Sequence, residues 1–141
     1  MEFKLFSSLP DDARKIRTEV FVCEQGFREE FDALDEIAVH IVAYKGAAAA
    51  GVCRIFRLNS SADCKDYVLG RLAVSKEFRG QKIGSEILNR AELAVKDLGG
   101  KTLRLHSQTR ASGFYRANGY TAFGEEDEDE GCPHIWMIKS L

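Results

Sequence analysis

The stretch RLAVSKEFRGQKIGSEIL, Arg71 to Leu88, decides how this sequence is interpreted. An apolar segment ends there at a cluster of Lys, Arg and Gly residues, and an amphipathic segment begins directly after it. A helix N-terminus presents unpaired N–H groups and partial positive charge, and glycine lets the backbone approach a ligand closely. The stretch predicts a phosphate site between a strand and a helix. A helix start that merely has basic neighbours explains these residues equally well.

Length and composition favour one domain over residues 1–141. Of these 141 residues, 45% are hydrophobic and 30% are charged, which suffices for a core without disulfides or metals. The formal net charge of −2 argues against general nucleic-acid binding, which usually needs a strongly basic face. A local basic site on such a protein fits one small anionic ligand better than a long polyanion.

The cysteines and the apolar runs bear on location. The four cysteines are widely spaced without a C-x-x-C pair, which favours free thiols in a reducing compartment. The opening MEFKLFSSLPDD has no cationic region followed by an apolar core, so it does not resemble a signal peptide. No apolar run approaches the roughly 20 residues that span a bilayer. We therefore expect a cytoplasmic protein, monomeric or homodimeric, without membrane partners.

Hydrophobic periodicity and turn residues predict an alternating order of strands and helices. Segments 26–36 (GFREEFDALDE) and 125–130 (EEDEDE) are interpreted as solvated polar loops. The expected strands are 2–6, 37–46, 50–58, 66–75, 101–107, 120–123 and 134–138, and the expected helices are 10–25, 83–98 and a short one in 108–120 with Thr109 as a candidate cap.

This order predicts the fold class. The strand–helix–strand unit from Tyr67 to Ser107 requires a parallel crossover, whereas strands 37–46 and 50–58 form an antiparallel hairpin. We expect an α/β (α+β) fold with a mixed, mostly antiparallel central sheet and helices on both faces.

The chain resembles the GCN5-related N-acetyltransferase (GNAT) family. LAVSKEFRGQKIGSEIL is similar to the family's acetyl-CoA motif, in which a strand ends in R-G-x-G-x-G and a helix follows. LHSQTRASGFYRANGYTAFG resembles the family's next segment, and Lys82 replaces the first glycine of its G-x-G. Three further segments resemble the small bacterial ElaA/YjcF-like acyltransferases: RTEVFVCEQGF, FDALDEIAVH and GCPHIWMIK.

The resemblance implies a site for acetyl-CoA as a cosubstrate. In the family, the turn's N–H groups hold the CoA pyrophosphate and the preceding strand bonds the pantetheine arm. The turn would comprise Arg79, Gly80, Gln81, Lys82, Ile83 and Gly84, with Ser85 at its edge, and the strand would contribute Leu72, Ala73 and Val74. Lys82 is expected to keep a negative φ and to reach a CoA phosphate. Asn118 either contacts the CoA arm or favours the helix end.

The resemblance also implies direct attack of an amine on the thioester. The amine must lose a proton, the oxyanion needs a donor and the leaving thiolate benefits from a proton. By resemblance, the Val74 N–H would be the oxyanion donor and Tyr115 the acid. Without the motif, Tyr115 beside Phe114 would be interpreted as core packing.

The acceptor side is less determined by the sequence. Glu24 is a candidate base acting through water, or a solvated acid, and Gln25 lies next to it. His106 and His134 are candidate acceptor-site residues, although strand histidines are more often bonded core residues. Arg71 either holds a structural carboxylate or binds an anionic group of the acceptor. No two histidines have metal-ligand spacing, so no metal is expected.

Two other functions compete with acetyl transfer to an amine. A CoA-binding or sensing module without transfer activity would keep the turn and lose the chemistry. A nucleotide-phosphate module is disfavoured because Gly80-Gln81-Lys82-Ile83 does not supply the G-K-[ST] end of a P-loop.

The acidic run 125–130 could attract a cationic amine such as a polyamine or a lysine side chain.

Overall fold

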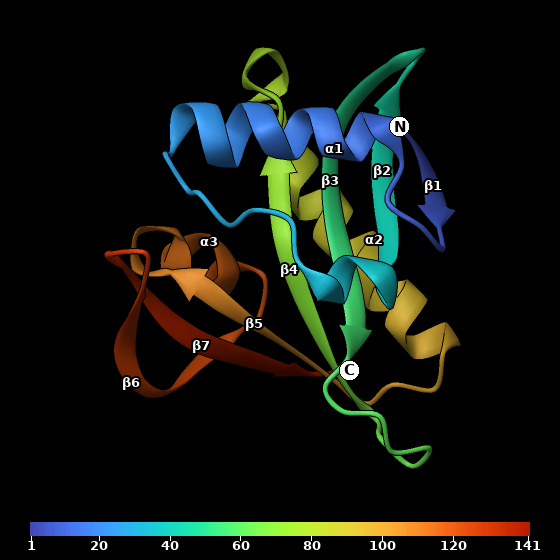
Figure 1. Cartoon of the computed structure of the whole chain (residues 1–141). Coiled ribbons are helices and arrows are strands. Elements are labelled where there is room, and N and C mark those ends of the chain that lie inside the picture. Colours follow the sequence, from blue (N-terminus) through green and yellow to red (C-terminus); the bar gives the residue numbers. More distant parts are fainter.

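The computed structural model describes residues 1–141 and contains one seven-stranded sheet with the strand order β1-β2-β3-β4-β5-β7-β6 (Figure 1). Its strands are β1 (Glu2–Phe6), β2 (Val39–Lys45), β3 (Ala48–Arg57), β4 (Asp66–Val74), β5 (Thr102–Gln108), β6 (Thr121–Asp129) and β7 (Cys132–Ser140). Its helices are α1 (Asp11–Arg17), α2 (Ile83–Asp97) and α3 (Ser112–Ala117), with a π-helix η1 (Thr18–Glu24) and 3₁₀ segments η2 (Ala33–Glu36), η3 (Lys76–Phe78) and η4 (Thr109–Ala111).

The topology confirms the predicted fold class. Strands β4 and β5 are parallel and joined through α2, and every other neighbouring pair is antiparallel. Helices α1 and α2 lie on opposite faces of the sheet (Figure 1). The apolar stripe that helical spacing predicts for α2 is buried in the larger core at Ile83, Ile87, Leu88, Ala91, Ala94 and Val95. Its last member, Leu98, is exposed. Helix α1 closes the smaller core against Val42, Val52 and Ala73.

The parallel pair β4 and β5 opens into a V, which Figure 1 shows as two strands diverging from a shared lower end. Their pairing ends at Leu69 and Leu105, beyond which β4 stays with β3 and β5 stays with β7. The register between β3 and β4 shifts here, and Arg71 adopts a left-handed backbone with φ 55°. A bulge bends its strand and breaks the ladder, so this bulge accompanies the opening.

The expected first helix, 10–25, is helical from Asp11 to Glu24, but beyond Arg17 it continues as the π-helix η1, where the Gln25 N–H donates to the Val20 carbonyl at 3.2 Å. Two other local predictions were wrong. Thr109 does not cap α3, which starts at Ser112 without a side-chain cap. Residues 125–129 of the acidic run are not a loop but an exposed part of β6, an edge strand paired with β7.

Segment 26–36, expected to be a solvated loop, folds onto the body of the protein. Asp32 and Asp35 form a capping box at η2, and the Glu30 and Asp35 side chains are buried. Sequence polarity alone suggested solvent exposure, but three arginines cover these carboxylates. Elsewhere, all four cysteines are free thiols, and none of the helices is long and apolar enough to cross a bilayer.

Candidate active site

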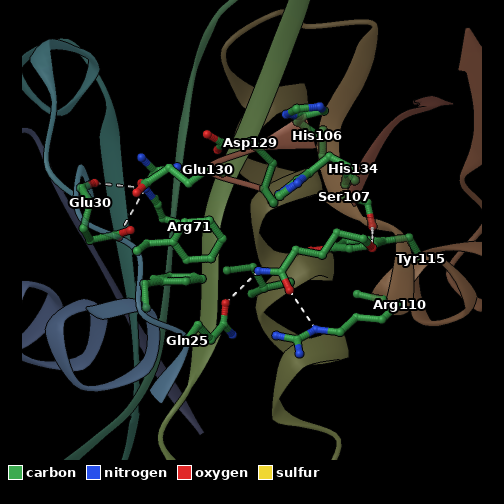
Figure 2. A pocket seen from close by; sticks show the side chains of 18 of the residues that line it. Gln25, Glu30, Arg71, His106, Ser107, Arg110, Tyr115, Asp129, Glu130 and His134 are labelled. Atoms are coloured by element: carbon green, nitrogen blue, oxygen red, sulfur yellow. Dashed lines mark hydrogen bonds and ion pairs between the residues drawn. The ribbon is translucent and has the colours of Figure 1, made fainter. Parts of the chain in front are cut away.

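A cavity of about 250 Å³ lies where β4 and β5 diverge (Figure 2). One wall is Leu69–Leu72 of β4 and another is Leu105–Gln108 of β5. Tyr115 of α3, Gln25 after η1 and His134 of β7 also line it. The fold thus brings together six residues that the sequence analysis named as candidates: Gln25, Arg71, Leu72, His106, Tyr115 and His134.

The turn before α2 presents a run of unpaired backbone donors. The first backbone hydrogen bond of this helix runs from the Glu86 N–H to the Lys82 carbonyl at 3.2 Å, and the N–H groups from Gly80 to Ser85 donate to no other backbone group. Several N–H groups at a helix start, together with its positive dipole end, suit a phosphate. The geometry therefore fits the pyrophosphate that the sequence comparison with the GNAT motif implied.

The conformation of Lys82 differs from the expectation. Its φ is +62° and its ψ is 20°, a left-handed conformation, whereas a negative φ was predicted. Gly80 is also left-handed, with φ 79°. Lys82 precedes the first helical residue, and the chain enters the helix through a left-handed residue here. A glycine at this place would adopt a positive φ without cost, whereas a lysine is strained by roughly 1–2 kcal/mol.

The other end of the turn packs closely on α3. A Cβ added at Gly84 would lie 3.3 Å from the Phe114 ring, so glycine permits this close approach of α2 and α3. The Asn118 amide donates to the Phe114 carbonyl at 2.9 Å and lies 3.4 Å from the Ser85 hydroxyl. Asn118 thus ends α3, as one of the two alternatives predicted, and lies beside the turn, while its contact with the CoA arm stays a prediction.

The end of β4 directs backbone groups toward the opening. The Ser75 N–H donates to the Ala50 carbonyl at 2.9 Å, and Gly51 and Val74 are the adjacent cross-strand pair. Bonded and non-bonded pairs alternate in an antiparallel ladder, so the N–H and C=O of Val74 point away from β3. Ala73 differs from its neighbours, because its side chain is buried in the smaller core on the α1 face.

Glu24 lies outside the cavity walls and pairs with the turn instead. Arg79 Nη1 and Nη2 donate to the two carboxylate oxygens of Glu24 at 2.9 and 2.8 Å, and Arg79 Nε donates to the Val74 carbonyl at 3.0 Å. The hydrogen bond from Arg79 lowers the pKa of Glu24 below its ordinary value. Both oxygens of the candidate base are therefore engaged, and a lowered pKa makes this carboxylate a weaker proton acceptor.

Tyr115 packs in the core and also lines the cavity. Its side chain is buried against Phe114 and Tyr120, with ring centroids 5.0 and 6.0 Å away. It also lines the cavity, and its hydroxyl forms no hydrogen bond within the chain. Burial raises the pKa of Tyr115 well above its usual value, so the hydroxyl keeps its proton at neutral pH. The role of this hydroxyl as the acid stays a prediction.

The two candidate histidines lie together on the cavity wall. The His106 and His134 rings have centroids 4.7 Å apart, and His106 stacks on Trp136 at 4.8 Å. His106 Nε2 lies 2.7 Å from a carboxylate oxygen of Asp127. His134 Nδ1 lies 2.8 Å from the Cys132 carbonyl.

Gln25 belongs to a chain of hydrogen bonds across the opening. The Gln108 amide donates to the Gln25 side-chain oxygen at 2.7 Å, and Arg110 Nε donates to the Gln108 oxygen at 2.8 Å (Figure 2). This chain links the end of η1 to the start of η4. The sequence analysis missed Gln108, Arg110 and Asp127, and nothing in their local sequence indicates these partners.

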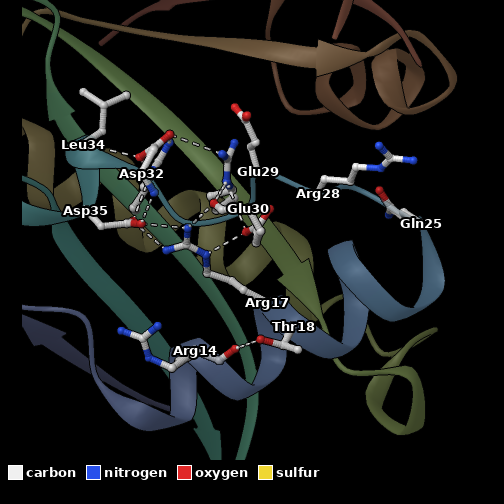
Figure 3. A network of polar contacts seen from close by, with 12 residues as sticks. Arg14, Arg17, Thr18, Gln25, Arg28, Glu29, Glu30, Asp32, Leu34 and Asp35 are labelled. Atoms are coloured by element: carbon white, nitrogen blue, oxygen red, sulfur yellow. Dashed lines mark hydrogen bonds and ion pairs between the residues drawn. The ribbon is translucent and has the colours of Figure 1, made fainter. Parts of the chain in front are cut away.

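An ionic network contacts Arg71 at the β4 bulge, and Figure 3 shows its central residues Arg17, Glu30 and Asp35. Arg71 Nε lies 3.1 Å from the backbone oxygen and from a carboxylate oxygen of Glu30. The same Glu30 accepts a hydrogen bond from Arg17 Nε at 2.8 Å. Arg71 therefore has the structural carboxylate that the sequence raised, and it also lines the cavity. Its role toward an acceptor stays a prediction.

In this network, burial and arginine contacts shift the pKa values of the carboxyl groups in opposite directions. Burial raises the pKa of Glu30, and the hydrogen bond from Arg17 does not fully offset it. Burial also pushes the pKa of Asp35 upward, but hydrogen bonds from Arg17, the Asp32 backbone and Arg54 outweigh it and leave this pKa well below its usual range. Arg54 donates to Asp32 at 2.6 Å and to Asp35 at 2.9 Å. No group of three or more His, Cys, Asp or Glu side chains is placed to share a metal ion.

The fold and the turn define the class of protein. The family model of the acetyltransferase (GNAT) domain matches residues 10–141. The chain therefore belongs to the GNAT acetyltransferase family, and its class of reaction is acyl transfer.

Particular relatives agree with this assignment. The chain is 36% identical over 131 residues to the uncharacterized N-acetyltransferase YjcF of Bacillus subtilis, covering 91% of this chain and 90% of YjcF. The crystal structure of Escherichia coli ElaA superposes with a TM-score of 0.84 and 27% identity, covering 98% of each chain. An aminoglycoside 6′-N-acetyltransferase complexed with coenzyme A shares the fold, with a TM-score of 0.77 and 17% identity over 99% of this chain and 97% of that one.

Proposed function

We propose that this chain is a single acetyltransferase domain that moves an acetyl group from acetyl-CoA to an amine. The observation that carries the proposal is the V between β4 and β5. At one end it has unpaired N–H groups from Gly80 to Ser85, and at the other a cavity lined by Tyr115, whose hydroxyl forms no hydrogen bond in the chain. A thioester whose diphosphate lies at the turn would reach the cavity along the open edge of β4.

The turn, the end of β4 and Tyr115 would each have a separate role in this reaction. The N–H groups of Gly80–Ser85 would hold the pyrophosphate, and the outward backbone groups of Leu72 and Val74 would bond the pantetheine arm. The Val74 N–H would donate to the thioester oxygen as negative charge develops on it. Tyr115, which its raised pKa keeps protonated at neutral pH, would give its proton to the departing sulfur.

Arg79 must adjust when this donor binds. Its Nε–H occupies the Val74 carbonyl, the acceptor that a pantetheine amide would take. The Glu24 pair holds the guanidinium in that place. We therefore expect Arg79 to leave the Val74 carbonyl in the bound state while its charge stays close to the phosphates.

A panel of amines with acetyl-CoA, followed by thiol release, tests the proposal. We would include spermidine, tyramine, free lysine and a lysine-containing peptide, and confirm each N-acetyl product by mass spectrometry. Transfer to at least one amine is expected, with Tyr115→Phe as the matched slow variant. Thermal stabilisation by acetyl-CoA without transfer to any amine would favour the CoA-binding module instead. A reducing, cytoplasmic location is proposed from the four free cysteines.

A further inference from the structure

His134 has a ring orientation that leaves one nitrogen available to the cavity. Its Nδ1 lies 2.8 Å from the Cys132 carbonyl oxygen. A carbonyl only accepts, so Nδ1 must carry hydrogen, and in the neutral ring Nε2 then holds the lone pair. His134 lines the cavity with only 6% of its surface exposed, and Nε2 has no partner in the chain.

The neighbours hold this ring in place. His106 packs on it with centroids 4.7 Å apart, and Phe27 meets it edge-on at 6.4 Å. His106 is itself held between Trp136 and the Asp127 carboxylate. A ring packed on its sides and bonded at Nδ1 cannot easily turn Nε2 away from the cavity.

The other acids and bases of the cavity are either exposed to solvent or bonded within the chain. Asp129 and Glu29 have no salt-bridge partner, but both are exposed. Glu30 is committed to Arg17 and Arg71. The Glu130 carboxylate accepts the backbone N–H groups of Arg28 and Glu29. His106 has its Nε2 on Asp127, and Glu24 lies outside the cavity walls on Arg79.

We propose that His134 Nε2 is the base that deprotonates the acceptor amine, an assignment that rests on the proposed function. The ammonium of the acceptor gives one proton to Nε2, and the freed lone pair attacks the thioester carbonyl carbon. The C–S bond then breaks with its electron pair on sulfur, which takes the Tyr115 proton. The second proton of the attacking nitrogen restores Tyr115 through water, and His134 returns its proton to solvent.

The cavity that His134 lines also contains titratable groups from several other elements. They are Asp129 and Glu130 of the β6–β7 hairpin, His106 of β5, Glu29 and Glu30 of the loop after η1, Arg71 of β4, Arg110 of η4 and Tyr115 of α3. Asp127 lies on His106 and Glu30 on Arg71, whereas Asp129 and Glu29 have no salt-bridge partner.

The variant His134→Asn tests the role of Nε2, because it removes the proposed base and keeps a hydrogen-bond donor for the Cys132 carbonyl. An Asn amide can take over the donation to the Cys132 carbonyl but has nothing at the Nε2 position. With an alkylamine acceptor from the panel at pH 7, kcat/KM should fall about a hundredfold or more, the usual size of general-base effects. The acid limb of the pH profile should move to the amine's own pKa, and the deficit should shrink with an aromatic amine, which is already uncharged.

Controls distinguish the possible failures. Acetyl-CoA should stabilise His134→Asn as it does the wild type, and His106→Asn should keep the acid limb. If wild type transfers to an amine and His134→Asn matches it at every pH, the base assignment is overturned and the proposed function stands. Nitrogen-15 spectra that place the hydrogen on Nε2 of the neutral ring would also overturn it. If wild type transfers to no amine, the proposed function falls and the assignment falls with it.

Discussion

Replacing Arg17 with Ala should destabilise the protein strongly, because this side chain is 1% exposed and is the centre of the ionic network. Arg17 donates to Glu30 Oε2 at 2.8 Å, to the Glu30 backbone oxygen at 2.9 Å and to both oxygens of Asp35 at 2.7 and 3.1 Å. Its removal leaves two buried carboxylates short of a partner. Breaking a buried pair from one side costs about 3–5 kcal/mol, so we expect a loss of that size in the free energy of unfolding.

Urea unfolding followed by circular dichroism measures this loss, and thermal unfolding gives a second readout. For a chain of this size, 1 kcal/mol corresponds to about 3–4 °C in Tm, so Tm should fall by about 10–20 °C. Arg14→Ala is the matched control, because Arg14 lies on the same helix, is exposed and has its guanidinium 4.9 Å from the same Phe31 ring that Arg17 covers at 4.7 Å. It should cost about 1 kcal/mol or less.

The pH dependence separates charge from packing. In Arg17→Ala, the pKa of Glu30, already raised by burial, should rise further, and a protonated Glu30 no longer needs a cation. The difference in the free energy of unfolding between wild type and Arg17→Ala should therefore be smaller at pH 5 than at pH 7. A loss below about 1 kcal/mol would refute the reasoning, and a large loss independent of pH would assign it to the lost packing of the side chain.

The remaining predictions concern the acid range, the catalytic tyrosine and the turn. The pKa values of Asp32 and Asp35 are lowered in the folded protein, so these two carboxylates contribute fully to stability above their ordinary pKa of 3.8 and lose that contribution below it. The free energy of unfolding, measured with urea, should therefore be lower at pH 3 than at pH 6, and equal values would contradict this. Tyr115→Phe should reduce turnover about tenfold or more while calorimetry finds CoA affinity nearly unchanged, and unchanged turnover with chemistry rate-limiting would return Tyr115 to core packing. Lys82→Gly should relieve the strain of the left-handed backbone at this residue, while glycine adds entropy to the unfolded chain. The free energy of unfolding should therefore rise by up to about 1 kcal/mol, and a clear fall would mean that the lysine side chain stabilises the turn. Lys82→Glu should weaken CoA more than dephospho-CoA, and equal weakening would exclude a contact with the 3′-phosphate.

The parts of the fold set by local sequence could be predicted. The strand, turn and helix from Arg71 to Leu88 follow from an apolar run, glycines and a helical stripe, and the structure confirms β4 and α2 there. The parallel crossover followed from topology rules rather than from any one residue. Gly119 comes just after the C-cap of α3 and is left-handed with φ 95°, a common way for a helix to end at a glycine.

What could not be predicted depends on partners distant in sequence. Glu24 looked like a surface acid near the acceptor because its partner Arg79 is 55 residues away. The buried carboxylates of segment 26–36 looked solvated because Arg17, Arg54 and Arg71 come from three other elements. The acidic run looked like a loop because its β propensity is low, yet pairing with β7 makes most of it a strand.

A titration of the nitrogen-15-labelled protein with acetyl-CoA, followed through assigned amide resonances, tests the central claim most directly. The unpaired N–H groups of Gly80–Ser85 and the outward N–H of Val74 should show the largest shifts and should saturate together. Cys132 and the exposed end of β6 should move little. If millimolar acetyl-CoA leaves the Gly80–Ser85 resonances in place, or shifts a different surface instead, the turn before α2 is not the site of the acetyl donor.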